Sequence, residues 1–207
     1  AAKKQRALAK AASQRKHDKA AALTKLSKAD KKIAKTYFLS ADELRSSKQT
    51  PLTAVGDSVL LDDSGDLQQV FPGAVVDGGV GRQADAVPGV IHSLAQRGEL
   101  AKNVLVNIGT NGYVTPQQAD DIVHAIGTDH QIFWVTAHVP TREWQDSVNN
   151  RIAKTAAKYK NVHVIDWYTT GKTHSSWFVS DHVHPNNQGN RYLTSIIAKA
   201  IAKETKA

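Results

Sequence analysis

The chain contains the stretch Leu52-Thr53-Ala54-Val55-Gly56-Asp57-Ser58, which predicts a buried strand that turns sharply into a helix. The short apolar run is typical of a strand in a parallel sheet, and Gly56 lets the backbone turn. Ser58 opens an expected helix at 58–70, so its hydroxyl would lie at the rim of the sheet, where a helix N-terminus favours developing negative charge. By itself, an isolated Gly-Asp-Ser more often caps a helix. Ser58 is therefore a candidate nucleophile that needs support from elsewhere in the chain.

Strand-like and helix-like segments alternate strictly from residue 51 onward, which predicts an α/β domain with a parallel sheet covered by helices on both faces. In such sheets, sites form beyond the carboxyl ends of the strands. The expected strands are 52–55, 74–76, 104–108, 131–137 and 162–165, and the expected helices are 58–70, 83–97, 116–126, 142–158 and 187–203.

The composition divides the chain at residue 50. The formal net charge of the 207 residues is +8, but residues 1–50 hold 14 Lys and Arg against 4 Asp and Glu, whereas the remainder is close to neutral. We therefore expect a basic Ala/Lys-rich linker or helical tail at 1–50, a single domain at 51–207, and no nucleic-acid partner. The tail is either a spacer or an attachment to an anionic surface.

The residue types that are missing exclude several classes of protein. The chain has no Cys, which excludes disulfides, thiolate catalysis and Cys-ligated zinc. No apolar run approaches the ~20 residues that a membrane helix needs, and no signal-peptide pattern is present. The first residue is Ala and Met is absent throughout. We therefore expect a processed form or a part excised from a longer protein.

Two further glycine-containing motifs follow expected strands. In Gly79-Val80-Gly81-Arg82 a glycine can direct its backbone N–H at a ligand oxygen, and in Gly109-Thr110-Asn111-Gly112 the asparagine amide can donate to an oxyanion. Read separately, each motif is more often an ordinary turn. The role of Arg82, which either fixes the loop or meets a substrate, stays open.

The last motif, Asp181-His182-Val183-His184, precedes the C-terminal helix. A carboxylate three residues before a histidine in a loop can orient the imidazole and leave its other nitrogen free to accept a serine proton. His138 and His174 add to the histidines of this region, but no helical His-x-x-x-His spacing occurs, so a metal site is disfavoured. Ser58, His184 and Asp181 are thus the candidate nucleophile, base and orienting acid of a serine acyl-transfer site.

These four motifs, in this order, resemble those of the SGNH hydrolase superfamily. The resemblance implies a three-layer α/β/α sandwich around a parallel sheet of about five strands, and a reaction that needs no cofactor or metal. It implies an oxyanion hole formed by the backbone N–H groups of Ser58 and Gly81 and the side chain of Asn111.

A narrower resemblance, over 52–203, is to the extracytoplasmic domain of peptidoglycan O-acetyltransferases. It also rests on 139–144 (Val-Pro-Thr-Arg-Glu-Trp) and on Asp166-Trp167-Tyr168. The chain departs from the pattern of this family at two positions. His182 occupies a position where glycine is expected, and Pro185 occupies one where leucine is more usual.

The narrower resemblance implies acetyl transfer to the 6-hydroxyl of N-acetylmuramic acid, from a donor delivered by an upstream membrane acyltransferase domain. It implies a location at the outer face of the membrane or in the wall of a Gram-positive bacterium. Tyr113 and Trp177 are candidates for contact with a sugar ring.

Two alternatives stay open at the level of the sequence. A plain SGNH esterase that removes acetyl groups from a carbohydrate or lipid would share the acyl-enzyme step. A wall-associated binding module would use the basic tail together with Tyr113, Trp177 and Phe178 as exposed aromatics, but it would need no activated serine.

Overall fold

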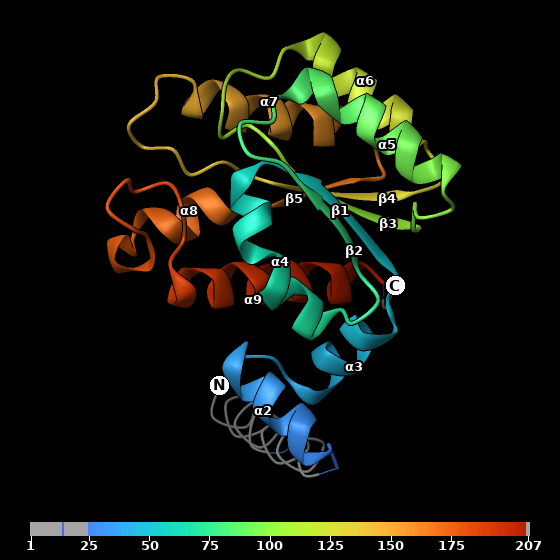
Figure 1. Ribbon diagram of the computed structural model, residues 1–207, viewed down its shortest axis with the longest axis vertical. Helices are drawn as coiled ribbons and strands as arrows, with labels where there is room; N and C mark the ends of the chain where they lie inside the picture. The colour runs from blue at the N-terminus through green and yellow to red at the C-terminus, as the bar shows by residue number, and fades with distance from the viewer. Residues whose placement is uncertain (1–13, 15–24, 206–207) are drawn as a thin grey trace, which may run out of the picture.

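The architecture is a parallel sheet between two layers of helices, as shown by a computed structural model that describes Gln14 and residues 25–205 (Figure 1). Every pair of neighbouring strands is parallel, and their order is β2-β1-β3-β4-β5. The strands are β1 (Leu52–Gly56), β2 (Val75–Gly78), β3 (Asn103–Asn107), β4 (Gln131–Val135) and β5 (Val162–Ile165).

The helices divide between the two faces of the sheet because β2 lies on one side of β1, whereas β3, β4 and β5 follow on the other side. Right-handed crossovers that run in opposite directions along a sheet place their helices on opposite faces. One layer holds α5 (Val87–Gln96), α6 (Pro116–Ile126) and α7 (Gln145–Lys158), and the other holds α4 (Ser58–Val70) and α9 (Asn187–Glu204) (Figure 1). The short helix α8 (Trp167–Lys172) follows β5 at the rim of the sheet. This arrangement confirms the predicted three-layer α/β/α class with five parallel strands.

The element boundaries agree closely with the expected ones, with local exceptions. The expected helix 83–97 is a short 3₁₀ turn, Ala84–Ala86, followed by α5, in which Pro88 occupies a position in the first turn that tolerates proline. Helix α7 begins at Gln145 rather than at 142. Helix α8 was not predicted, because six residues are too few to show a helical period.

The centre of the sheet is the most buried part of the molecule. Every residue of β1 and β3 is buried, as expected for strands that are covered on both faces. In the register of the sheet, Gly56 at the end of β1 lies beside Gly78 of β2 and Asn107 of β3. The loops that follow these three strands therefore start at one common edge.

Helices α2 (Lys28–Thr36) and α3 (Ala41–Gln49) precede the sheet and pack beneath α4 and α9 (Figure 1). Tyr37, Leu39 and Leu44 are buried in the same core as the sheet. The Tyr37 hydroxyl also donates a hydrogen bond to the carboxylate of Asp66 on α4, at 2.6 Å. The basic segment thus has ordered, packed structure from residue 28 onward, while most of residues 1–24 lies outside the described part.

A buried carboxyl group sits between α4 and α9. Asp63 is fully buried, and its Oδ1 accepts a hydrogen bond from the Thr194 hydroxyl at 2.8 Å. Its Oδ2 has no hydrogen-bond partner among the described residues. Burial raises the pKa of the Asp63 carboxyl well above its ordinary value, and the bond from Thr194 opposes this only in part.

We expect Asp63→Asn to gain stability relative to the wild type as the pH rises. A carboxyl whose pKa is raised by folding stabilises the native state below its unfolded pKa, near 4, and loses that contribution as the pH rises through the folded pKa. The amide cannot ionise and still offers an oxygen to Thr194. Urea unfolding gives the free energy of unfolding of each protein. The value for the variant minus the value for the wild type should be at least about 1 kcal/mol larger at about pH 8 than at about pH 4.5.

The exposed neighbour Asp62 provides the matched control, because Asp62→Asn removes a carboxyl group from the same helix without a burial penalty. A difference between Asp63→Asn and wild type that does not change with pH would show that Asp63 is not held neutral by its surroundings.

Candidate active site

Ser58 is positioned by the sharp turn between β1 and α4. It is the first residue of α4, and Asp57 caps the helix, with Oδ1 accepting a hydrogen bond from the Val59 N–H at 3.0 Å. Ser58 is partly buried, so its hydroxyl is held by the turn yet reachable. The position at a helix N-terminus favours negative charge that develops next to this hydroxyl.

The second oxygen of Asp57 joins this turn to the loop after β3. Oδ2 accepts a hydrogen bond from the Thr110 N–H at 3.2 Å, and the whole side chain is buried. Burial raises the pKa of Asp57, whereas hydrogen bonds from Thr110 and Val59 lower it. Asp57 therefore fixes Ser58 relative to the loop that carries Asn111.

His184 contacts Ser58 on one side and Asp181 on the other. The Ser58 Oγ and the His184 Nε2 are 2.9 Å apart, and the His184 Nδ1 and the Asp181 Oδ2 are 2.6 Å apart. With a proton on Nδ1 that is donated to the carboxylate, Nε2 accepts from the serine hydroxyl. This is the geometry that a serine nucleophile, a histidine base and an orienting carboxylate require.

Asp181 also holds the backbone of its own loop. Its Oδ1 accepts hydrogen bonds from the N–H groups of Val183 and His184, at 2.9 and 3.0 Å. Partial burial opposes ionisation, but the bonds from Val183 and His184 outweigh it and lower the pKa of Asp181 below its ordinary value. The carboxylate is thus kept charged, as the partner of an imidazole that accepts a proton must be.

The expected oxyanion donors come from the loops after β1, β2 and β3. Gly81 has a φ of +70°, a conformation that glycine adopts at little cost, and the Asn111 Nδ2 donates to the Arg82 carbonyl at 3.2 Å. The Arg82 guanidinium donates to the Gly56 carbonyl at 2.9 Å and pairs with Asp77 at 2.6 Å. Arg82 therefore fixes the loop, which answers a question that the sequence left open.

The candidate sugar-contacting aromatics differ in exposure. Tyr113 is 52% exposed, and its ring centroid lies 6.1 Å from that of Trp144. Trp177 is buried and stacks between His174 and Tyr192, at 3.8 and 3.9 Å, and Phe178 is buried as well. The expectation that Trp177 and Phe178 lie exposed at the rim is corrected by this packing, since both residues are buried and rings cover both faces of Trp177.

The two departures from the family pattern have clear local settings. His182 has a φ of +60°, in the left-handed region that favours glycine, and its side chain is exposed. Pro185 is buried and pairs across a short bridge with Phe178. The backbone at position 182 therefore suits the glycine expected there, and His182 adopts this conformation at a cost.

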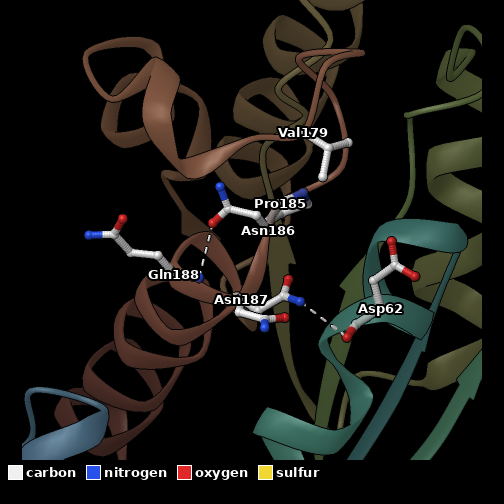
Figure 2. A pocket seen from close by; sticks show the side chains of 7 residues that line it. Asp62, Val179, Pro185, Asn186, Asn187 and Gln188 are labelled. Carbon is white, nitrogen blue, oxygen red and sulfur yellow. Dashed lines mark hydrogen bonds between the residues drawn. The ribbon is translucent and has the colours of Figure 1, made fainter.

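A hollow of about 510 Å³ opens next to this loop, between α4 and the start of α9 (Figure 2). Asp62, one helical turn beyond Ser58, lines one side, and Pro185, which follows His184, lines the other. Asn190 donates to the Asp62 carbonyl at 3.2 Å. The side-chain amides of Asn187 and Gln188 bond to no other described residue, so they are available to a ligand.

Two negative findings apply to residues 25–205 and Gln14. No group of three or more His, Asp or Glu side chains is arranged to hold a metal ion in this part of the chain. No helix in it is long and apolar enough to cross a membrane.

The sequence analysis did not predict that Asp57 links two loops. Its position directly before Ser58, at the start of a helix, could have indicated this role. The sequence analysis also missed His138, whose Nδ1 donates to the His182 carbonyl at 3.1 Å and so supports the loop of the candidate base. No sequence pattern links these two residues, which lie 44 positions apart.

Comparison with known proteins gives relatives over most of the domain. No protein-family model matches the chain. It is 34% identical to YrhL of Bacillus subtilis over 148 residues and to the O-acetyltransferase OatA of Staphylococcus aureus over 155 residues, or 72% and 74% of the chain. The chain spans about a quarter of the length of these curated relatives, 23% and 25%.

A solved structure supports the fold. The C-terminal catalytic domain of the Streptococcus pneumoniae peptidoglycan O-acetyltransferase OatA, solved with a methylsulfonyl adduct, superposes with a TM-score of 0.65. The match covers 76% of this chain and 95% of that domain at 24% identity. With its sheet topology and its relatives, the chain belongs to the SGNH hydrolase superfamily and, within it, to the group that contains the OatA peptidoglycan O-acetyltransferases.

Proposed function

We propose that this domain is an O-acetyltransferase that works through an acetyl-serine intermediate. The Ser58 Oγ attacks the carbonyl carbon of an acetyl donor while its proton passes to the His184 Nε2. The N–H groups of Ser58 and Gly81 and the Asn111 amide stabilise the tetrahedral oxyanion. When the intermediate collapses, the leaving group takes the proton from His184 and the acetyl group stays on Ser58.

The second half of the reaction reverses the roles. A sugar hydroxyl gives its proton to the His184 Nε2 and attacks the acetyl carbonyl, and the Ser58 Oγ leaves with that proton. Asp181 stabilises the imidazolium in both halves without accepting its proton. We propose the 6-hydroxyl of N-acetylmuramic acid in peptidoglycan as the acceptor. The similarity to peptidoglycan O-acetyltransferases supports peptidoglycan as the substrate.

The observation that carries the proposal is the unbroken chain of contacts from Ser58 through His184 to Asp181. A binding module has no use for a serine hydroxyl held 2.9 Å from an imidazole whose other nitrogen meets a carboxylate. The esterase alternative uses the same contacts, with water in place of the sugar. Transfer is favoured by the 34% identity to an O-acetyltransferase.

An acceptor needs groups that hold it beside the ester. The free amides of Asn187 and Gln188 line the hollow between α4 and α9, where they can bind sugar hydroxyls (Figure 2). Tyr113, two residues after Asn111, offers an exposed ring. We propose these surfaces as acceptor contacts. The acetyl donor, in this proposal, comes from a membrane acyltransferase domain upstream in the same protein, at the outer face of a Gram-positive cell membrane. The part of the basic segment that precedes α2 would then act as the linker, since α2 and α3 pack on the domain.

Partition of the acetyl group between sugar and water tests the function. With an activated acetyl ester and muropeptides or chitooligosaccharides, we expect acetylated glycan to form and free acetate to fall as the acceptor concentration rises, since a positioned hydroxyl outcompetes water. Mass spectrometry should find acetyl on Ser58 with a slow ester, and Ser58→Ala should abolish both. Acetate release that no glycan changes, together with stripping of acetylated peptidoglycan, would instead establish an esterase.

His184→Ala should reduce turnover about as much as Ser58→Ala, because the hydroxyl then has no base. Asp181→Ala should cost less, since its carboxylate orients the ring and does not take the proton. The rates are compared on one small acetyl ester. His182→Ala is the matched control, as that exposed imidazole lies two residues from the candidate base; a larger loss in the control than in His184→Ala would move the base to position 182.

Asn111→Ala should lower kcat about 10²- to 10³-fold with little change in KM, because the amide acts on charge that develops in the transition state. Steady-state kinetics on the same ester separate the two constants. A change confined to KM would make Asn111 a substrate-binding residue.

A further inference from the structure

A second pocket, of about 360 Å³, lies on the other side of the His184 loop from the hollow described above. It opens at the carboxyl ends of β4 and β5, between the segment after β4, helix α8 and the turn at His182. It therefore lies along the same edge of the sheet as Ser58 and Asn111. The proposed chemistry does not use it, and His182 is the one lining residue that belongs to the four motifs.

Aromatic rings form its walls. The His138 ring stacks on Phe178 with centroids 4.2 Å apart, and Tyr168 lies 6.5 Å from His138. Gly171 on α8 allows this close packing, because a Cβ at that position would come within 2.8 Å of the Phe178 ring. The pocket thus has a preformed, largely apolar wall of the kind that typically binds small organic groups.

The pocket also carries one unpaired positive charge. The Lys172 Nζ lies 5.5 Å above the Tyr168 ring, and it forms no ion pair with any residue of the described part of the chain. None of the residues that line the pocket is acidic. An anionic group that enters would meet an ammonium without competition from a carboxylate of the wall.

The wall of this pocket is part of the support of the candidate base. His138 donates from Nδ1 to the His182 carbonyl at 3.1 Å, and the His182 N–H donates to the Val179 carbonyl at 3.0 Å. Burial lowers the pKa of His138, which keeps its ring neutral, so that Nε2 is left as an acceptor. A group held here would therefore lie against the turn that positions His184.

We propose that this pocket is an acceptor subsite that binds a carboxylate borne on a partly apolar group of the glycan. The carboxylate would pair with Lys172, and the apolar part would lie on the rings of Tyr168 and Phe178. This inference rests on the proposed transfer to a wall glycan and adds a basis for choosing among acceptors. A carboxylate on a sugar substituent and one on an attached peptide offer the same chemistry, and the experiment separates them.

Binding is measured by calorimetry on the Ser58→Ala protein, which cannot turn over, with and without Lys172→Gln. The probes are N,N′-diacetylchitobiose, the N-acetylglucosaminyl–N-acetylmuramic acid disaccharide with its lactyl carboxylate, and the same disaccharide with a stem peptide. We expect Lys172→Gln to weaken binding of a carboxylate probe about tenfold, the usual worth of a charged hydrogen bond, and to leave chitobiose unchanged. Lys203→Gln, on the exposed end of α9, is the matched control.

If Lys172→Gln weakens binding of the peptide-free disaccharide, the pocket binds the carboxylate on the sugar. If it weakens binding of the peptide-bearing probe alone, the pocket binds a carboxylate of the peptide. Thr141→Trp, an exposed substitution in the pocket wall, should weaken the same probe by obstruction. Equal effects of Lys172→Gln on all three probes, or none, would overturn the proposal. Labelling of Ser58 by a slow acetyl ester is followed separately in proteins that retain Ser58, so a failed acyl-enzyme step and a failed subsite give different results.

Discussion

The buried carboxylate of Asp57 ties together two loops that the chain order keeps far apart. One oxygen caps α4 at the Val59 N–H and the other accepts from the Thr110 N–H, so the turn that carries Ser58 and the loop that carries Asn111 are held by one side chain. Because this carboxylate is buried, loss of either bond would leave an unpaired polar group in the core. The relative position of Ser58 and Asn111 depends on this link.

The sheet topology explains why the two hydrogen bonds of Asp57 are sufficient to hold Ser58 and Asn111 in place relative to each other. Strand β2 lies on one side of β1, and β3, β4 and β5 follow on the other side, so the order in which strands are added reverses between β1 and β3. A crevice opens at the carboxyl ends of strands at such a point, and the candidate site lies there. Arg82 closes the β2 side by binding the Gly56 carbonyl and Asp77. The His184 loop is fixed separately, by Asp181 from within and by the His138–His182 bond from the β4 side. Each candidate catalytic group is thus held in place by another side chain.

The fold could be predicted from the sequence because each strand shows as a short apolar run and each motif follows one. Parallel strands align their carboxyl ends, so Ser58, Gly81 and Asn111 had to meet once the alternation was recognised. The contact of His184 with Ser58 could be predicted only from chemical complementarity and family resemblance, since 126 positions separate them. The burial of Trp177 could not be predicted, because the ring that covers one of its faces, Tyr192, comes from α9. The pocket at His138 and Lys172 likewise exists only through tertiary packing.

The candidate catalytic groups do not by themselves determine which acceptor the site uses. In the proposed roles, Ser58, His184 and Asp181 would activate a sugar hydroxyl and a water molecule equally well, so these roles do not favour transfer over hydrolysis. That choice has to come from surfaces that hold a sugar beside the ester, where positioning offsets the much higher concentration of water. The two pockets on either side of the His184 loop differ in character, one lined by free amides and the other by aromatic rings and an ammonium. A glycan spanning both would present its hydroxyl at the loop between them, which is where His184 lies.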